Sequence, residues 1–160
     1  MTPLPHTHSC FVCGESNAVG MRLRFHYDGR VVRTEFNPRP EQCGFKGVVH
    51  GGITATLLDE MMAWACAVQG GQFGYCAELN VRYQRSLQPD VPVTATAELV
   101  ANRRNRFFEI KSEIRDASGS LLASATGKYI PIKPADAEQF VGDLIGDLSL
   151  LRPPSTPGVG

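Results

Sequence analysis

The sequence lacks an excess of charge of either sign, because 16 lysines and arginines balance 16 aspartates and glutamates. Without a dominant basic block, binding to nucleic acid has no electrostatic support. Apolar runs long enough to cross a membrane are also missing, since the most apolar stretch, residues 47–70, is interrupted by Asp59 and Glu60. The N-terminal residues show no basic segment followed by an apolar core, so we expect no secretory signal and a cytoplasmic protein.

Cysteine is scarce as well, with five residues, an odd number that argues against a disulfide framework. We expect these cysteines to be free thiols in a reducing cytoplasm. Cys10 and Cys13 form a C-x-x-C pair, and His6, His8 and Cys43 are conceivable partners for them in a zinc site. The chain has no second C-x-x-C pair, however, so we expect no metal and no cofactor.

One long segment is expected to be helical and most others to be strands. Residues 51–68 are almost wholly apolar and end before Gly70 and Gly71, which favours a buried helix. Residues 21–36 alternate apolar and polar side chains on either side of Asp28-Gly29, which predicts a hairpin. Alternation and β-branched residues predict four further strands within residues 75–87, 91–101, 106–116 and 120–132.

These elements predict an α+β fold, in which a curved antiparallel sheet of about six strands wraps around one long central helix. We expect an irregular lead-in over residues 1–20, the folded domain over 21–133 and a C-terminal extension over 134–160. The end of that extension, residues 152–160, is expected to be a disordered tail. A short amphipathic helix is predicted before the tail from the spacing of Phe140, Val141, Leu144, Ile145 and Leu148.

The predicted central helix carries two adjacent carboxylates. The residues one turn away from Asp59 are mostly small, which allows other groups to approach it closely. We therefore expect Asp59 to line a cleft and to serve as a base or nucleophile. Glu60 is expected to point to solvent at the helix edge or to pair with an arginine.

His50-Gly51-Gly52 stands at the predicted start of this helix. The first N–H groups of a helix lack intrahelical partners and carry the positive end of its dipole, so they suit a carbonyl oxygen that gains negative charge. Glycines there let a ligand come close to the backbone. On this chemistry alone, an ordinary helix start and a structural histidine remain open alternatives.

The motif HGGITATLLDE, in which Asp59 follows His50 by nine positions, and the later segment AELNVRYQRSL resemble the PaaI-like group of hotdog-fold acyl-CoA thioesterases. The resemblance covers roughly residues 10–132. It implies a hotdog fold, hydrolysis of a fatty or aryl acyl-CoA to free acid and CoA, and a homodimer or dimer of dimers with active sites at the dimer interface. It further implies Asp59 as nucleophile or general base, the Gly52 N–H as oxyanion donor, and His50 and Gly51 as parts of the pocket.

The chain departs from the family pattern at one expected helper. Several members carry an Asn six positions before the histidine, where this chain has Gly44, and Gln42 or Asn37 in the same loop is the candidate substitute. Cys76 stands near the position of a second polar helper. The resemblance also implies that basic residues at a later hairpin contact the phosphates of CoA, a role that suits arginine. These candidates are Arg103, Arg104 and Arg106.

Two other functions remain open. The missing Asn at Gly44 suggests a non-catalytic hotdog protein that binds acyl-CoA or an acyl carrier. A hotdog hydratase is disfavoured, because the predicted helix contains no histidine. The lead-in around Cys10 and Cys13 resembles one found in the PaaI-like group, where we interpret it as packing or capping.

Overall fold

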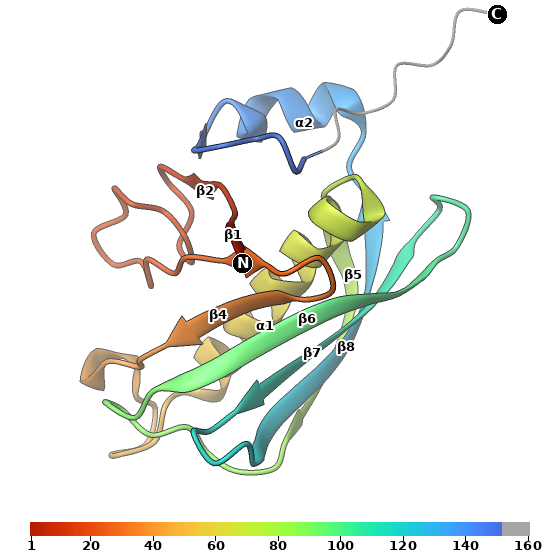
Figure 1. The fold of residues 1–160 in the computed structure, drawn as a ribbon. Coiled ribbons are helices and arrows are strands. Elements are labelled where there is room, and N and C mark those ends of the chain that lie inside the picture. Colours follow the sequence, from red (N-terminus) through yellow and green to blue (C-terminus); the bar gives the residue numbers. More distant parts are fainter. Residues whose placement is uncertain (152–160) are drawn as a thin grey trace, which may run out of the picture.

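The computed structural model describes residues 1–151. Within them, a main antiparallel sheet has the strand order β1-β3-β4-β6-β7-β8-β5 and curls around one long helix, α1, Gly51–Ala65 (Figure 1). Strands β4 to β8 all contact α1, which confirms the expected α+β architecture. The strands of this sheet are β1 (Thr2–Pro3), β3 (His26–Tyr27), β4 (Val32–Phe36), β5 (Gly74–Tyr83), β6 (Val93–Asn102), β7 (Phe108–Arg115) and β8 (Leu121–Pro131).

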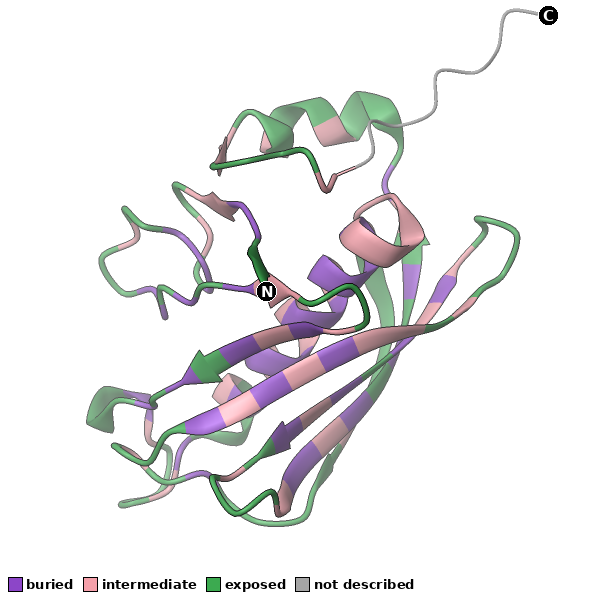
Figure 2. Ribbon diagram, viewed as in Figure 1, coloured by how far each residue is buried: buried purple, intermediate pink, exposed green. Residues whose placement is uncertain are grey.

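Helix α1 begins at the predicted residue, and its last turn changes form. It continues as a π-helix, η2, Cys66–Gly70, and Gly71 ends it in the left-handed conformation with φ of 79°. A glycine suits this position because it has no Cβ to clash. Buried residues follow α1 through the centre of the fold (Figure 2). Side chains of α1 that are at most 2% exposed include Leu57, Leu58, Met61, Met62 and Trp64.

Strand β7 shows the predicted alternation most clearly. Its residues Phe108, Ile110, Ser112 and Ile114 are buried, and the residues between them are at least partly exposed. The buried row faces α1, since side chains on one face of a strand recur at every second position. The alternation in the sequence therefore identified the face of the sheet that packs on the helix.

The predicted strand over residues 21–25 is wrong, although its alternation in burial is present. In this hairpin only the two residues of β3 pair with β4, so residues 21–25 have no ladder partner in β4. The N–H groups of Met21 and Leu23 instead donate to the carbonyls of Phe11 and Val12 in the lead-in, at 2.8 and 2.9 Å. Carbonyl groups of the lead-in thus accept the hydrogen bonds that a neighbouring strand would otherwise accept.

The C-terminal extension contains a helix, but earlier than predicted. Helix α2, Pro134–Val141, ends at Gly142, and the next apolar residues form β9, Leu144–Ile145, which pairs with β2, His6–Thr7, of the lead-in. The expected tail lies outside the described residues, and the three-part division of the chain stays a prediction. None of the helices within residues 1–151 is both long and apolar enough to cross a membrane.

Candidate active site

His50 caps the start of α1. Its Nδ1 accepts a hydrogen bond from the Gly52 N–H at 2.8 Å, and its carbonyl oxygen accepts from Ile53 and Thr54. This cap satisfies an N–H group that has no partner inside the helix. Because Nδ1 accepts this hydrogen bond, the other ring nitrogen, Nε2, is left as the donor of the imidazole. The expected oxyanion donor, the Gly52 N–H, is therefore held by the expected pocket residue His50 in this conformation.

Gly44, where the family pattern has an Asn, lies against the imidazole of His50. A Cβ at Gly44 would stand 2.9 Å from His50 Cδ2, which is closer than carbon atoms pack. Residue 44 therefore cannot carry a side chain while His50 keeps its observed position. The missing Asn is thus coupled to the way in which the histidine caps the helix.

Gln42 holds the loop that leads to His50. Its Oε1 accepts a hydrogen bond from the Arg39 N–H at 2.8 Å, across the short 3-10 turn η1, Pro40–Gln42. Its backbone carbonyl accepts from the His50 N–H at 2.9 Å. The side chain is buried, so within this chain Gln42 positions His50 rather than offering its amide oxygen to a ligand.

Two hollows flank the helix start, and His50 borders both. The first, of about 640 Å³, is bordered by residues that include Gln42, Cys43, His50, Gly52 and Thr56. The second, of about 660 Å³, is bordered by residues that include Gly44, His50, Gly51, Tyr83 and Arg85. The predicted helix-start residues therefore face open space large enough for part of a small-molecule ligand.

Asp59 lies in the third turn of α1 and is partly exposed. Its Oδ1 accepts a hydrogen bond from the hydroxyl of Tyr129, on β8, at 2.6 Å. Burial, together with this hydrogen bond, raises the pKa of Tyr129. The hydroxyl therefore keeps its proton and remains a donor, which fixes the orientation of the Asp59 carboxylate.

Cys76 joins this pair from β5. It stands opposite Tyr129 in the β5–β8 ladder, and its thiol interacts with both Tyr129 and Asp59. Cys76 is an exposed residue, and partial desolvation of its thiol, with the charge of Asp59 adding to it, raises the pKa of Cys76. The structure thus brings the predicted helper next to Asp59 as a protonated thiol, which is a weak donor and a poor nucleophile.

Tyr129 is a site residue that the sequence pattern does not reveal, because the pattern only places it in the last strand. A usable signal existed, since a tyrosine at an inward position of a strand must find a hydrogen-bond partner for its hydroxyl. The acid of the central helix that faces β8 supplies that partner, as Asp59 does here.

The predicted arginine cluster lies near the end of η2, far from the start of α1. It occupies the hairpin between β6 and β7. Phe108, which follows that hairpin, packs against Gly70 of η2, since a Cβ added to Gly70 would stand 3.1 Å from the Phe108 ring. Arg103 pairs with Glu109 at 3.0 Å. Within one chain, the three arginines of this cluster therefore lie away from the helix start. They are Arg103, Arg104 and Arg106.

A second chemically active group surrounds Glu60, and the expectation that this acid faces solvent or an arginine is wrong. Its Oε1 accepts from Trp64 Nε1 at 3.2 Å and lies 3.7 Å from Cys10 Sγ. Burial, with the charge of Cys10 adding to it, raises the pKa of Glu60 to about 7. The Cys13 thiol and nearby backbone N–H groups lower the pKa of Cys10 to about 5.

Residues 46–123, which include the helix start, Asp59 and Cys76, match the family model of the Thioesterase superfamily. This match covers 78 of the 160 residues, and over them the chain resembles the thioesterase superfamily. This match, with the observed architecture, confirms the hotdog fold and the resemblance carried by the His-Gly-Gly motif. The matches to thioesterases support a thioester hydrolase.

Individual proteins of known sequence or structure are also similar to this chain. Acyl-coenzyme A thioesterase 13 from Homo sapiens is 28% identical over 97 residues, which are 59% of this chain and 68% of that protein. The crystal structure of a thioesterase superfamily protein, 28% identical, matches with a TM-score of 0.70 over 77% of this chain, which spans 63% of that protein. A hypothetical thioesterase protein from Streptococcus pneumoniae, solved with coenzyme A, is 18% identical and matches with a TM-score of 0.62 over 68% of this chain and 87% of its own.

Proposed function

We propose that this protein hydrolyses acyl-CoA thioesters to a free acid and CoA, with Asp59 as the general base. The observation that carries the proposal is the short hydrogen bond from Tyr129 to Asp59 Oδ1, at 2.6 Å, on a partly exposed face of the central helix. One carboxylate oxygen is held by the phenol, which leaves the other to bind a water molecule. Removal of a proton by a carboxylate in this position activates water for attack.

The proposed reaction proceeds through one tetrahedral intermediate. Asp59 takes a proton from water as the oxygen of that water bonds to the thioester carbon. The carbonyl electrons move to oxygen, and the intermediate then collapses by breaking the C–S bond. The thiolate of CoA leaves and takes up a proton. Asp59 acting instead as a nucleophile, through an anhydride, is the other mechanism consistent with this placement.

The oxyanion donor in this proposal is the N-terminus of α1. Seven positions separate Gly52 from Asp59, which is about 10 Å along a helix axis that rises 1.5 Å per residue. In the reaction, the carboxylate contacts the water, the water attacks the carbonyl carbon, and the carbonyl oxygen accepts from the N–H group. This chain of contacts is bent and spans less than about 10 Å. We therefore propose that Asp59 of one protomer faces the helix start of a second copy, where the imidazole of His50 yields the Gly52 N–H to the substrate.

The edge of the sheet supports this dimer. Strand β5 is the last strand of the main sheet, so one side of its backbone has no partner strand within residues 1–151. Long, exposed strand edges pair readily with other strands. Leu79, Val81 and Tyr83 stand on the α1 side of this strand, as their ladder partners show, and Tyr83 remains 55% exposed. A second copy paired along β5 would cover this apolar row beside Asp59.

Recognition of CoA is assigned to basic side chains at the sheet margins. Arg104 and Arg106 form no ion pair within residues 1–151, and Arg85 borders the second hollow at the helix start. Guanidinium groups suit the phosphates of CoA. That one structural relative was solved with coenzyme A is consistent with this choice. We place the reaction in a reducing compartment such as the cytoplasm, because all five cysteines are free thiols.

The alternative is a hotdog protein that binds acyl-CoA without cleaving it, and Gly44 is the reason to consider it. Thiol release from a panel of short, medium, long and aryl acyl-CoA esters, measured beside calorimetric binding, separates the two functions. We expect CoA release from at least one class of ester. Binding without release would establish the alternative. If the protein showed no binding and no release, both functions would be rejected.

A further inference from the structure

The bend formed by residues 10–14 presents two sulfur atoms from one short turn. The Gly14 N–H donates to the Cys10 carbonyl at 2.8 Å, and a Cβ on Gly14 would stand 2.3 Å from that oxygen. Residue 14 must therefore be glycine for the bend to close. The Val12 N–H donates to Cys10 Sγ at 3.2 Å, an arrangement that stabilises negative charge on sulfur.

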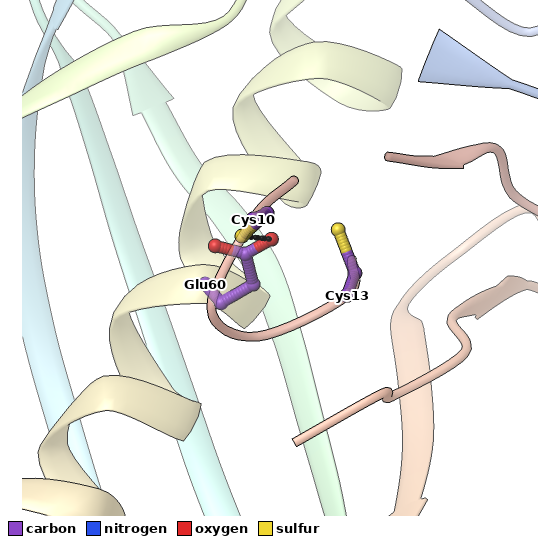
Figure 3. A group of neighbouring side chains, drawn as sticks. All are labelled: Cys10, Cys13 and Glu60. Carbon is purple, nitrogen blue, oxygen red and sulfur yellow. Dashed lines mark hydrogen bonds between the residues drawn. The ribbon is translucent and has the colours of Figure 1, made fainter. Parts of the chain in front are cut away.

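Helix α1 brings a third ligand to this bend. Glu60 faces it from the helix, and Cys13 lies on the same bend as Cys10 (Figure 3). The ligand atoms of these three residues all lie within 4.8 Å of one another. Cys13 is fully buried, and Cys10 is partly buried, so the group is shielded from bulk water.

We propose that Cys10, Cys13 and Glu60 bind a zinc ion that fastens the lead-in to the central helix. Two thiolates and a carboxylate are ordinary zinc ligands, with Zn–S near 2.3 Å and Zn–O near 2.1 Å. Tetrahedral geometry with these bond lengths separates sulfur from oxygen by about 3.6 Å. The distance between Cys10 Sγ and Glu60 Oε1 is already 3.7 Å. Binding releases the thiol protons to solvent and leaves a fourth position for water.

The ligand set differs from the one that the sequence suggested and rejected. His6 Nε2 and His8 Nδ1 are turned toward Glu15, at 3.0 and 3.6 Å, and do not join the cluster. Glu60, which lies 50 positions from Cys10, takes their place. From the sequence, only His6, His8 and Cys43 are candidate partners of the C-x-x-C pair, and Glu60 is not among them.

The metal would act on structure rather than on the reaction. The lead-in provides hydrogen-bond partners for residues 21 and 23, and through β2 it also pairs with the C-terminal extension. Fixing Cys10 and Cys13 to α1 therefore fastens three parts of the chain to one another. Metal binding of this kind contributes directly to folding free energy.

The test uses the full chain, reduced and freed of metal under argon, and titrated with Co²⁺ and then Zn²⁺. We expect one equivalent of Co²⁺ to give a thiolate charge-transfer band with tetrahedral visible bands, and Zn²⁺ to displace it and raise the melting temperature. The variants Cys10→Ser and Glu60→Gln should each weaken Zn²⁺ binding at least tenfold. The matched controls Cys43→Ser and His8→Asn should leave it unchanged.

Three outcomes would overturn the proposal. One is a reduced native protein, kept under argon, that gives no thiolate band with Co²⁺. A second is binding that Glu60→Gln leaves unchanged. The third is binding that is lost on His8→Asn. Circular dichroism of each variant checks whether it is folded, and the result for the native protein does not depend on any variant.

Discussion

Tyr129 donates its hydroxyl hydrogen to Asp59 Oδ1 at 2.6 Å and so joins strand β8 to the central helix across 70 positions of sequence. The tyrosine is 1% exposed, whereas Asp59 is partly open to solvent. One end of the hydrogen bond is therefore fixed by the core and the other lies where a substrate can reach it. This pair is the structural basis for the role proposed for Asp59.

Tyr129→Phe keeps the ring in the core and removes the donor. A hydrogen bond to a charged group contributes about 1.5–3 kcal/mol, so the loss should lower kcat roughly 10- to 100-fold while KM changes little. Steady-state kinetics on the best acyl-CoA of the panel measure both constants. Tyr75→Phe, at an exposed position of β5, is the control. Equal kcat values for Tyr129→Phe and the native protein would remove Tyr129 from the mechanism.

Gly44→Ala should displace the imidazole of His50, because the new Cβ would stand 2.9 Å from Cδ2. Loss of an N-cap costs about 0.5–2 kcal/mol, so urea unfolding should show a stability decrease of that order, together with a lower kcat/KM. Gly142→Ala is a suitable control, since its φ is −63° and the nearest atom to its Cβ lies at 3.7 Å. Unchanged stability and activity in Gly44→Ala would contradict the coupling of Gly44 to His50.

Leu79→Glu should separate the proposed dimer. It places a charge in the apolar row of β5 that a second copy would cover, and buried unpaired charges are costly. Light scattering coupled to size exclusion should show the native protein as a dimer or larger and the variant shifted toward monomer, with activity lost in proportion. Val91→Glu, in an exposed loop, controls for the added charge. A fully active monomer would refute a site shared between protomers.

Arg104→Gln combined with Arg106→Gln should weaken recognition of CoA without touching the reaction. Removing both exposed guanidinium charges from the phosphate-binding surface should raise KM for an acyl-CoA roughly three- to tenfold. KM for the matching acyl-pantetheine, which lacks the nucleotide phosphates, should stay the same. Arg30→Gln serves as the control for the removal of a single surface charge. Equal KM changes for both esters would exclude a phosphate contact.

Much of the fold followed from local sequence pattern. The apolar segment between His50 and Gly70 specified the helix, and the alternation from Phe108 to Ile114 specified a strand and its buried face. The segment over residues 21–25 misled because its burial alternates as in a strand. Its hydrogen bonds go to an irregular lead-in, and periodicity carries no information on which backbone groups pair.

The site was harder to predict, because its contacts join residues that are distant in sequence. Asp59 was identified from its small neighbours along the helix, which are local. Its partner Tyr129 and the partners of Glu60 come from other elements, so no spacing within the helix could indicate them. The steric conflict between Gly44 and His50 is also invisible in sequence, since it depends on how the loop folds back.

The central claim is that Asp59 activates water at the thioester, and Asp59→Asn tests it most directly. The amide keeps the shape and can still accept from Tyr129, but it cannot take a proton from water. We predict that kcat for the best acyl-CoA falls roughly 10²- to 10⁴-fold, with CoA-ester binding and melting temperature preserved. Asp136→Asn, on the exposed face of α2, should match the native protein. An Asp59→Asn enzyme as active as the native protein would contradict the account.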